Sequence, residues 1–399
     1  MTENPMVLFI ILAITEILTL AVIRQYLYER SWLSYYFAIT IHAVLSIWIW
    51  TLWFQTVSFR GMPDDPAHVW SVMSLRGMLL AVVIPRILII IFHYSGRLSL
   101  RPSGAYSRKL TTAGFAVSSV IMLVFAGSAL IGRSNVRTEN HTIAIEGLHP
   151  DLEGLRIVHI SDLHLPCFYH HHGKLAEIMQ KINELEPDLL INTGDFINAG
   201  WREFDRFDTI LSKASARYGQ YAVMGNHDFG TYHPTYTGAE RENNVRLMNR
   251  FISASGYKVL NDEFEMIKIG NASVALLGVT TKGSFPDIEH GNLEKASQRI
   301  YGEDLKILLA HDPNQWDNEV ADKTDIDITF SGHTHGMQIG IYTKRIKWSP
   351  AKYFYPRWAG MHEIDGQYLV VNRGLGVLGI PFRIWMPPEI TVITLVTEG

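Results

Sequence analysis

Four long apolar stretches occupy the first third of the chain, at about residues 6–23, 35–57, 73–94 and 111–132. Each approaches or exceeds the roughly 20 residues that an α-helix needs to cross the hydrocarbon core of a bilayer. Four such runs in succession, separated by polar loops, are not typical of buried helices in a soluble domain. The first run lacks a basic leading segment and a small-residue cleavage site, so it predicts an anchor and not a signal peptide. Residues 1–132 are therefore predicted to form a transmembrane domain with four helices.

Lys and Arg residues near the ends of these spans indicate how the chain lies in the membrane. The loops after the first and third spans carry six of them, Arg24, Arg30, Arg97, Arg101, Arg108 and Lys109. The opposite side carries three, Arg60, Arg133 and Arg137. This excess predicts that the two loops lie in the cytoplasm. The N-terminus and the C-terminal two thirds of the chain would then lie outside. The reverse orientation stays open.

Ionisable residues also fall within the predicted spans, where they are costly and often functional. They are Glu16, His42, Arg76 and Arg86. One interpretation is a polar pocket that holds a lipid phosphate. The alternative, which we favour, is an internal ion pair, with snorkelling for residues near the span ends. Pro85, directly before Arg86, predicts a break or kink in the third helix.

Short apolar runs replace the long ones after residues 133–153, which are predicted to form a polar linker and a first strand at His141–Ile145. Their length and their Val and Ile content predict buried strands. They are Leu155–Ile160, Asp188–Asn192, Tyr221–Met224, Leu305–Ala310 and Asp327–Phe330. Apolar residues at helical spacing predict helices around 175–185 and 245–252, and Gly270-Asn271 predicts a hairpin turn. Residues 154–399 are therefore expected to form an α/β (α+β) domain, a two-sheet β-sandwich flanked by helices.

Five polar clusters directly follow predicted strands. They are Asp162-Leu163-His164, Gly194-Asp195, Gly225-Asn226-His227-Asp228, Ala310-His311-Asp312 and Gly332-His333-Thr334-His335. Sites in open α/β sheets form just past the carboxyl ends of strands. Together the clusters supply carboxylate, imidazole and amide ligands for two divalent metals, and such a pair makes a nucleophile from water at neutral pH. The ordered set predicts a metal-dependent hydrolase.

Composition sets further limits. The formal net charge of −4 gives no basic field, so nucleic acid is not an expected partner. A hydrophobic content of 47% is high for a soluble enzyme, and the excess lies in residues 1–132. The single cysteine, Cys167, excludes an intrachain disulfide.

From about residue 140 to 399 the chain resembles the calcineurin-like metallophosphoesterases. It is most similar to a bacterial branch that opens on a Ser-Asp-Leu-His motif, here Ser161–His164, and closes on Gly-His-Thr-His-Gly, here Gly332–Gly336. The segments Val371–Gly376 and Pro387–Ile390 also resemble that branch. Met337 departs from the pattern, since many relatives carry glycine there, and it is expected to narrow the pocket. The resemblance implies a metallophosphoesterase catalytic domain over residues 154–399.

The resemblance also implies a set of metal ligands. Asp162, His164 and His335 would hold one ion, Asn226, His311 and His333 the other, and Asp195 would bridge both. One carboxylate can hold two cations at the ~3.5–4 Å separation that suits in-line displacement. Imidazole and carboxylate ligands suit Mn, Fe or Zn better than Ca. We expect two divalent ions, Mn²⁺ first, with Zn²⁺ and Fe open.

Further residues are expected to act on the substrate. His227 lies next to a predicted ligand and is the expected general acid, because imidazolium can donate a proton near neutral pH. Asp228 is a weaker candidate for orienting that ring. Arg373 could bind a phosphate oxygen bidentately, or instead bond loop carbonyls. The contiguous His170–His172 are more typical of solvated residues at the entrance than of a metal site.

The function predicted is that of a membrane-anchored phosphohydrolase acting on a phosphoester or pyrophosphate bond of a phospholipid or lipid-linked sugar. Some relatives in the branch cleave the pyrophosphate of a nucleotide-linked acyl sugar. The segment 346–358 mixes aromatic and cationic residues, which suits either a membrane interface or an ordinary packed loop. A tethered phosphodiesterase or phosphatase for soluble substrates, and a non-catalytic membrane sensor, remain the alternatives. The expected location is a bacterial inner membrane, with the catalytic domain periplasmic and the cytoplasmic side open.

Overall fold

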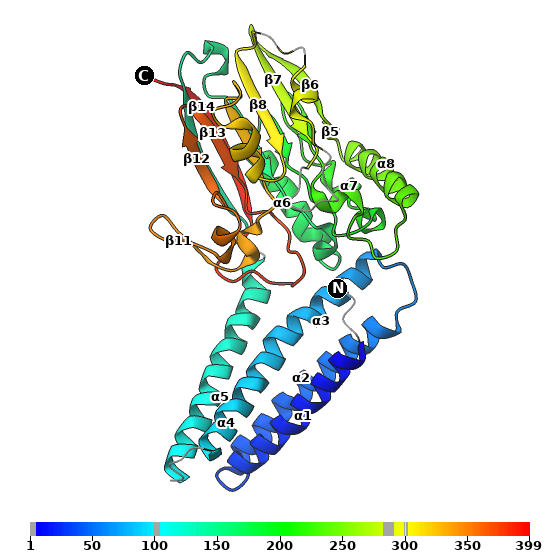
Figure 1. The fold of residues 1–399 in the computed structure, drawn as a ribbon, viewed down its shortest axis with the longest axis vertical. Coiled ribbons are helices and arrows are strands. Elements are labelled where there is room, and N and C mark those ends of the chain that lie inside the picture. Colours follow the sequence, from blue (N-terminus) through cyan, green and yellow to red (C-terminus); the bar gives the residue numbers. More distant parts are fainter. Residues whose placement is uncertain (1–4, 99–103, 134, 282–290, 299, 301) are drawn as a thin grey trace. The chain divides into compact units, whose positions relative to one another are not determined.

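The computed structural model describes residues 5–98, 104–133, 135–281, 291–298, 300 and 302–399 (Figure 1). Its contacts divide the chain into two compact units. The helical unit comprises Met1–Gly61, Trp70–Leu130 and Gly379–Phe382. The sandwich unit comprises Met62–Val69, Ile131–Leu378 and Arg383–Gly399. A short piece of the N-terminal third therefore belongs to the sandwich unit.

Long helices at all four predicted apolar stretches build the helical unit. They are α1 (Pro5–Leu27), α2 (Trp32–Ser58), α3 (Pro66–Met78), α4 (Ile84–Leu98) and α5 (Gly104–Gly127). A π-helical turn, Leu79–Val83, joins α3 and α4 into one span, and a second, Ser128–Gly132, extends α5. Among the described residues, four spans are long and apolar enough to cross a membrane: Met6–Leu27, Trp32–Ser58, Pro66–Leu98 and Arg108–Gly132.

The irregularity predicted at Pro85 takes the form of the π-helical turn Leu79–Val83, which ends one residue before α4 begins. Proline has no backbone N–H and disturbs the hydrogen-bond ladder of the preceding turn. A π turn absorbs that disturbance without breaking the helix. The Pro85 carbonyl itself accepts a hydrogen bond from Ser118 Oγ at 2.9 Å.

An internal ion-pair cluster contains three of the four ionisable residues in the spans, Glu16, His42 and Arg86. Arg86 donates to Glu16 at 2.8 Å and to Ser46 Oγ at 2.7 Å. His42 Nε2 lies 2.9 Å from the other Glu16 oxygen. The guanidinium of Arg86 is thus neutralised within the protein, which favours the ion-pair interpretation over a lipid-phosphate pocket. Arg101, which we counted for the orientation, lies outside the described residues.

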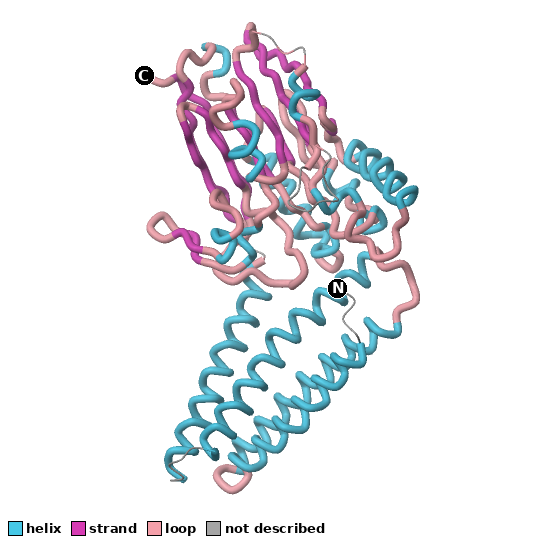
Figure 2. The backbone as a smooth tube through the Cα atoms, viewed as in Figure 1, coloured by secondary structure: helices cyan, strands magenta, loops and turns pink. Residues whose placement is uncertain are grey.

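Two six-stranded sheets form the sandwich unit (Figure 2). The first has the order β1 (Arg137–Ile145), β14 (Glu389–Thr397), β2 (Arg156–Ile160), β3 (Leu189–Asn192), β4 (Gln220–Ala222), β5 (Lys258–Val259). The second has the order β12 (Gly360–Ile364), β13 (Gln367–Val371), β9 (Ile328–Ser331), β8 (Leu305–Ala310), β7 (Ala272–Val279), β6 (Glu263–Ile269). A small ribbon pairs β10 (Ile341–Tyr342) with β11 (Lys347–Trp348). The expected two-sheet fold is confirmed.

One apolar core lies between the two sheets. Ile157 and Ile191 from the first sheet and Leu276 and Leu309 from the second are completely buried in the same cluster. Among the described residues, four α-helices lie wholly within the unit, α6 (His172–Glu184), α7 (Asp208–Leu211), α8 (Gly238–Ala254) and α9 (Leu293–Ser297). α6 buries the predicted face, Leu175, Ile178, Met179 and Ile182. This packing makes the sheets a rigid frame for the loops at their edge.

Candidate metal centre

The five polar clusters lie where strands end, as the sequence predicts. Those of the first sheet follow β2, β3 and β4, which run parallel to one another. Those of the second sheet follow β8 and β9, which are also parallel. Parallel strands direct their carboxyl ends to the same edge, so each sheet brings its own clusters together.

The first group of converging side chains consists of Asp162, His164 and His335, all buried. The Nε2 atoms of His164 and His335 lie 3.1 Å apart. His335 Nε2 lies 3.2 Å from an Asp162 carboxylate oxygen. Three potential ligand atoms from loops far apart in sequence therefore face one point.

The second group consists of Asp195, His311 and His333. His311 Nε2 lies 3.1 Å from an Asp195 oxygen and 3.1 Å from His333 Nδ1. The same Asp195 oxygen lies 3.8 Å from His164 Nε2 in the first group. Asp195 is therefore positioned between the two groups, which suits a bridging carboxylate.

Backbone carbonyls orient two of the imidazole rings. His164 Nδ1 lies 3.0 Å from the Ile197 carbonyl, and His311 Nδ1 lies 2.7 Å from the Thr193 carbonyl. A carbonyl accepts only from a protonated nitrogen, so in each neutral ring the Nε2 lone pair faces the cluster. Outer hydrogen bonds of this kind orient metal-bound histidines.

Asn226 supports the fit of the site to a metal. Its amide nitrogen donates to Tyr232 Oη at 2.9 Å. Its Oδ1 atom is buried and has no hydrogen-bond partner among the described residues. A buried carbonyl oxygen without a partner is costly, and a cation would satisfy it. Together with carboxylates and imidazoles, this donor set fits the divalent metals that the sequence predicts.

The electrostatics of the pocket favour bound cations. Burial lowers the pKa of His164 to about 3, with His335 adding to the effect, so the ring is neutral as a ligand must be. Burial alone would raise the pKa of Asp195, but His311 and His227 hold it well below its usual value. Burial alone would lower the pKa of His311, whereas Asp195 raises it to about 10. Asp195 is therefore ionised, and a bound cation would replace the proton on His311 as its partner.

Left-handed backbone is concentrated at the predicted ligands. Five of them have positive φ angles, Asp162 (52°), His164 (41°), Asp195 (56°), His333 (71°) and His335 (49°). Such residues are uncommon outside glycine and cost about 1–3 kcal/mol each. The fold maintains this strain in order to turn the side chains inward after each strand.

Two glycines are required by close approach. A Cβ on Gly225 would lie 2.1 Å from Asp195 Oδ1, and one on Gly332 would lie 1.9 Å from Ser161 Oγ. Any side chain at these positions would displace the loops that carry the ligands.

His227 lies at the edge of this cluster and is half-buried. Its Nδ1 lies 2.6 Å from the Asn198 carbonyl, and its backbone N–H donates to Asp195. Its ring stacks on Tyr232 with 4.3 Å between centroids and lies 5.1 Å from the His164 ring. The ring is fixed by its surroundings, with Nε2 available to a substrate.

Asp228 takes a different position from the one expected. Its carboxylate accepts hydrogen bonds from the backbone N–H groups of Asp195, Phe196, Ile197 and Gly225. No described hydrogen bond joins it to the His227 ring, which instead bonds Asn198. Asp228 therefore supports the loop of Asp195, and its expected role in orienting His227 receives no support from this geometry.

Arg373 is completely buried and not directed at the cluster. It pairs with Glu389, and with Glu139 at 2.9 Å, and its guanidinium lies 3.8 Å above the Tyr342 ring. This placement favours a structural role over contact with phosphate. The residues His170–His172 are exposed, in agreement with the entrance interpretation. Met337 is 39% exposed beside His335.

Three residues that sequence reasoning did not identify also contact the site. Tyr355 Oη lies 2.7 Å from His333 Nε2, and Tyr232 contacts both Asn226 and His227. Arg383, completely buried, lies 3.3 Å from His335 Nδ1 and donates to the Gly376 carbonyl. No sequence motif predicts these contacts, because they join residues that are brought together only by the tertiary fold.

Comparisons with known proteins agree with this site. The family model for calcineurin-like phosphoesterase matches residues 155–337. The chain is 30% identical over 269 residues to the uncharacterized metallophosphoesterase YkuE of Bacillus subtilis (strain 168), which covers 65% of this chain and 85% of that protein. It is 28% identical to the UDP-2,3-diacylglucosamine pyrophosphatase LpxG of Chlamydia muridarum, over 62% of this chain and 85% of that one.

A further relative extends the similarity into the helical part. The chain is 26% identical over 347 residues to a transmembrane protein with metallophosphoesterase domain of Danio rerio, covering 83% of this chain and 75% of that protein. That share exceeds the part of the chain that follows Gly132. The aligned part of this chain therefore extends into the apolar helical segment.

Proposed function

Because the chain belongs to the calcineurin-like metallophosphoesterases, which are metal-dependent phosphoester hydrolases, we propose that it cleaves a phosphoester or pyrophosphate bond of a membrane lipid or lipid-linked sugar. The observation that carries the lipid assignment is an exposed apolar surface beside the metal centre. The four apolar spans and the similarity to LpxG, a pyrophosphatase of a diacylated sugar nucleotide, agree with it.

We call this surface the apolar rim. Nine large apolar side chains are exposed among the described residues after Gly132, and seven of them form the rim. They are Met337, Ile341, Ile346, Trp348, Tyr353, Phe354 and Trp385. Trp385 joins the others because the Ile384 N–H donates to the Gln338 carbonyl. Exposed apolar side chains on such neighbouring segments favour an interaction site for a membrane or ligand.

Cations are interspersed with the apolar side chains of the rim. Lys344, Arg345, Lys347 and Lys352 are all exposed. Figure 1 shows that the hairpin containing β11 projects from the body of the sandwich unit. Apolar and cationic side chains on one projecting hairpin suit the interface between acyl chains and phosphate headgroups.

Three hydrogen bonds attach residues 348–358, the segment that carries Trp348, Tyr353 and Phe354 of the rim, to the ligand loop. Tyr355 Oη lies 2.7 Å from His333 Nε2, Ser349 Oγ donates to the Gly336 carbonyl, and Thr334 Oγ1 donates to the Trp358 carbonyl. A lipid engaged by the rim would therefore have its phosphate close to His333 and His335.

The residues of the site divide the chemistry between them. Two divalent ions, Mn²⁺ in our proposal, would supply an activated water and neutralise phosphoryl oxygens when bound. Asp162, His164 and His335 would hold one, Asn226, His311 and His333 the other, with Asp195 shared. His227, fixed through Nδ1, holds its Nε2 proton for the leaving oxygen when the ring is an imidazolium.

Orientation in the membrane forms part of the proposal. Four crossings would leave the N-terminus, the α2–α3 loop and the sandwich unit on the same side of the membrane. The excess of Lys and Arg in the other two loops assigns the sandwich unit to the external, periplasmic side of a bacterial inner membrane. Protease accessibility of the sandwich unit in intact spheroplasts tests this, and protection there would place it in the cytoplasm.

The substrate proposal is tested on full-length protein in phospholipid vesicles with Mn²⁺. Phosphatidic acid and UDP-2,3-diacylglucosamine serve as lipid substrates, and bis-p-nitrophenyl phosphate as a soluble one. We expect Trp348→Ser/Phe354→Ser to lower kcat/KM at least tenfold on the lipid substrates and less than twofold on the soluble ester. Met266→Ser removes an exposed apolar side chain on β6 and is the matched control.

Turnover of only the soluble ester by the native protein would support the tethered phosphodiesterase instead. Equal losses on both substrates in the rim variant would mean that the rim acts through folding and not through lipid.

A further inference from the structure

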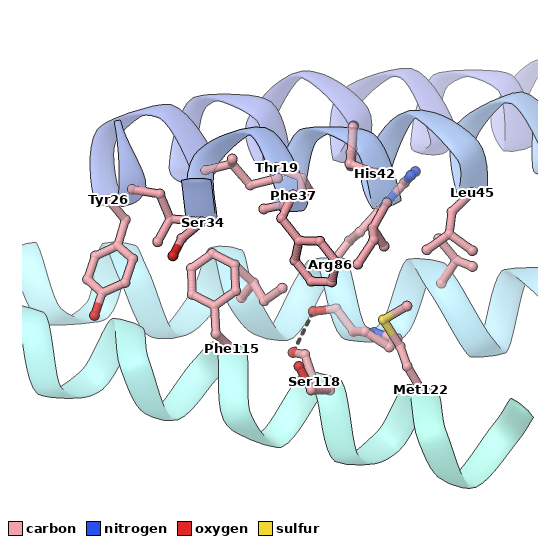
Figure 3. A pocket seen from close by; sticks show the side chains of 18 of the residues that line it. Thr19, Tyr26, Ser34, Phe37, His42, Leu45, Arg86, Phe115, Ser118 and Met122 are labelled. Carbon is pink, nitrogen blue, oxygen red and sulfur yellow. Dashed lines mark hydrogen bonds between the residues drawn. The ribbon is translucent and has the colours of Figure 1, made fainter. Parts of the chain in front are cut away.

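A cavity of about 360 Å³ lies within the helical unit, between α1, α2, α4 and α5 (Figure 3). Most of its lining is aliphatic or aromatic, including Ile23, Phe37, Leu45, Phe115 and Met122. Cavities of this size and character are typical of sites for small apolar ligands. Its walls belong to helices that are long and apolar enough to span a membrane, so lipid would surround them there.

The cavity extends along half of the span. Ser34 and Tyr26 line one end, and Leu45 and Met122 line the other (Figure 3). Along α2, the 11 residue steps from Ser34 to Leu45 rise roughly 16 Å at about 1.5 Å each. Half of the hydrocarbon core measures about 15 Å. The cavity therefore matches the depth of one leaflet, which is the length available to one acyl chain.

The cavity opens sideways toward the bilayer. Phe37 and Ile41, which line it, are at the same time 67% and 40% exposed on the surface of α2. Ser119 of α5 lines it and is also exposed. A chain from the surrounding leaflet can thus enter between α2 and α5 without passing through water.

The deep part of the cavity carries no net charge. Arg86 contributes to the wall, but Glu16 and Ser46 occupy its guanidinium group. An ion pair completed within the protein leaves no free cation for a phosphate at this depth. The occupant of the deep part is therefore hydrocarbon.

Cations surround the shallow end instead. Arg24 and Arg30 lie beside the end of α1, and Arg108 and Lys109 lie near the start of α5, all exposed. Arg30 stacks over Tyr26, a lining residue, with 4.6 Å to the ring centroid. Basic residues at the end of a span attract anionic headgroups.

We propose that this cavity is a binding site for one acyl chain of an anionic phospholipid, taken from the leaflet on the side of the 28–31 loop. Its headgroup lies among the cations at the shallow end, and its chain extends to Leu45 and Met122. The site is a structural lipid site at the end of the helical unit that carries the 28–31 loop. It does not depend on the proposed substrate, because every lining residue belongs to the helical unit.

The test uses delipidated full-length protein in detergent, titrated with palmitoyl-oleoyl phosphatidylglycerol and followed by native mass spectrometry. We expect one tightly bound lipid, and binding of the zwitterionic phosphatidylcholine analogue at least tenfold weaker. Ala38→Leu adds volume inside the cavity and should weaken phosphatidylglycerol binding at least tenfold. Ala43→Leu makes the same change on the exposed face of α2, outside the lining, and should bind like the native protein.

Ser119→Leu fills the cavity from α5 and repeats the test should Ala38→Leu fail to fold. Unchanged binding in a folded cavity-filling variant, or an equal loss in Ala43→Leu, would overturn the acyl-chain assignment. Equal binding of the two phospholipids would overturn the anionic assignment.

Discussion

Asp64, in the loop between α2 and α3, gives the sharpest test of how the chain is built. Its side chain is completely buried within the sandwich unit. It accepts from Tyr236 Oη at 2.9 Å, forms an ion pair with Arg202 at 3.2 Å, and lies 3.4 Å from His233 Nε2. A residue from the predicted transmembrane domain is thus buried in the sandwich unit and anchors it through contacts with three side chains.

Replacing Asp64 with alanine should destabilise the sandwich unit strongly. Removing one partner of a buried ion pair costs about 3–5 kcal/mol, because the other groups are left uncompensated. Arg202 is partly exposed and can be solvated, so we expect the lower half of that range. At about 2–4 °C per kcal/mol, the unfolding midpoint should fall by roughly 10 °C.

Catalysis should fall as well. A Cβ on Gly200 would lie 2.4 Å from Asp64, so the carboxylate packs directly on the 198–202 loop. The Asn198 carbonyl of this loop holds His227 Nδ1. Loosening the loop releases the proposed general acid, so kcat on a soluble ester should fall severalfold while KM changes little.

The assay is thermal unfolding of full-length protein in detergent, combined with soluble-ester kinetics. Asp65→Ala is the matched control, because Asp65 caps α3 through the backbone N–H groups of Ala67 and His68. Losing such a cap costs about 1 kcal/mol. If Asp64→Ala were no less stable than Asp65→Ala, the proposed anchor would be wrong.

Three further predictions concern the sandwich unit. Burial raises the pKa of Glu203 to about 8 from 4.5, so the folded state holds this proton more tightly than the unfolded state does. The free energy of unfolding should therefore fall as pH rises from 4.5 to 8, by at most ~1.4 kcal/mol per pH unit. Glu203→Gln should remove this pH dependence in urea titrations. Asp195→Asn should reduce bound metal from two ions to one or none by elemental analysis and lower activity at least a hundredfold, whereas the exposed Asp205→Asn should change neither. Arg373→Ala leaves Glu389 buried without its partner and should cost about 3–5 kcal/mol in unfolding experiments, while a rise in KM without loss of stability would restore its expected contact with phosphate.

The ligand groups could be predicted because their signal is local. Asp162, Asp195 and His333 each end an apolar run, and the frame of parallel strands brings such ends to one edge. The apolar helices were predictable for a similar reason, since an apolar run of about 20 residues is typical of a helix that spans a membrane. Their ends were not, because caps such as Ser31 Oγ, which accepts from the Ser34 N–H, set them by a single hydrogen bond.

The missed features depend on side-chain direction or on distant contacts. Asp228 follows His227 in the chain, yet its carboxylate turns away to four backbone N–H groups, and adjacency in sequence does not encode that choice. Tyr355 reaches His333 from 22 residues away, and Arg383 reaches His335 from 48. Nothing in the local pattern around either residue distinguishes it from an ordinary loop residue.

Asp64 also changes which experiment separates the two enzyme hypotheses. The sequence divides the chain at about residue 132, and removing everything before that point looks like a fair test of turnover on soluble substrates. The contacts of Asp64 show that this deletion would also remove a buried partner of Arg202, His233 and Tyr236. If the truncated enzyme lost activity, the loss could come from the missing contacts of Asp64 and would not show that the enzyme needs the membrane. Substitutions in the apolar rim keep Asp64 in place, so they alone separate an enzyme that needs lipid from one that is merely tethered to it.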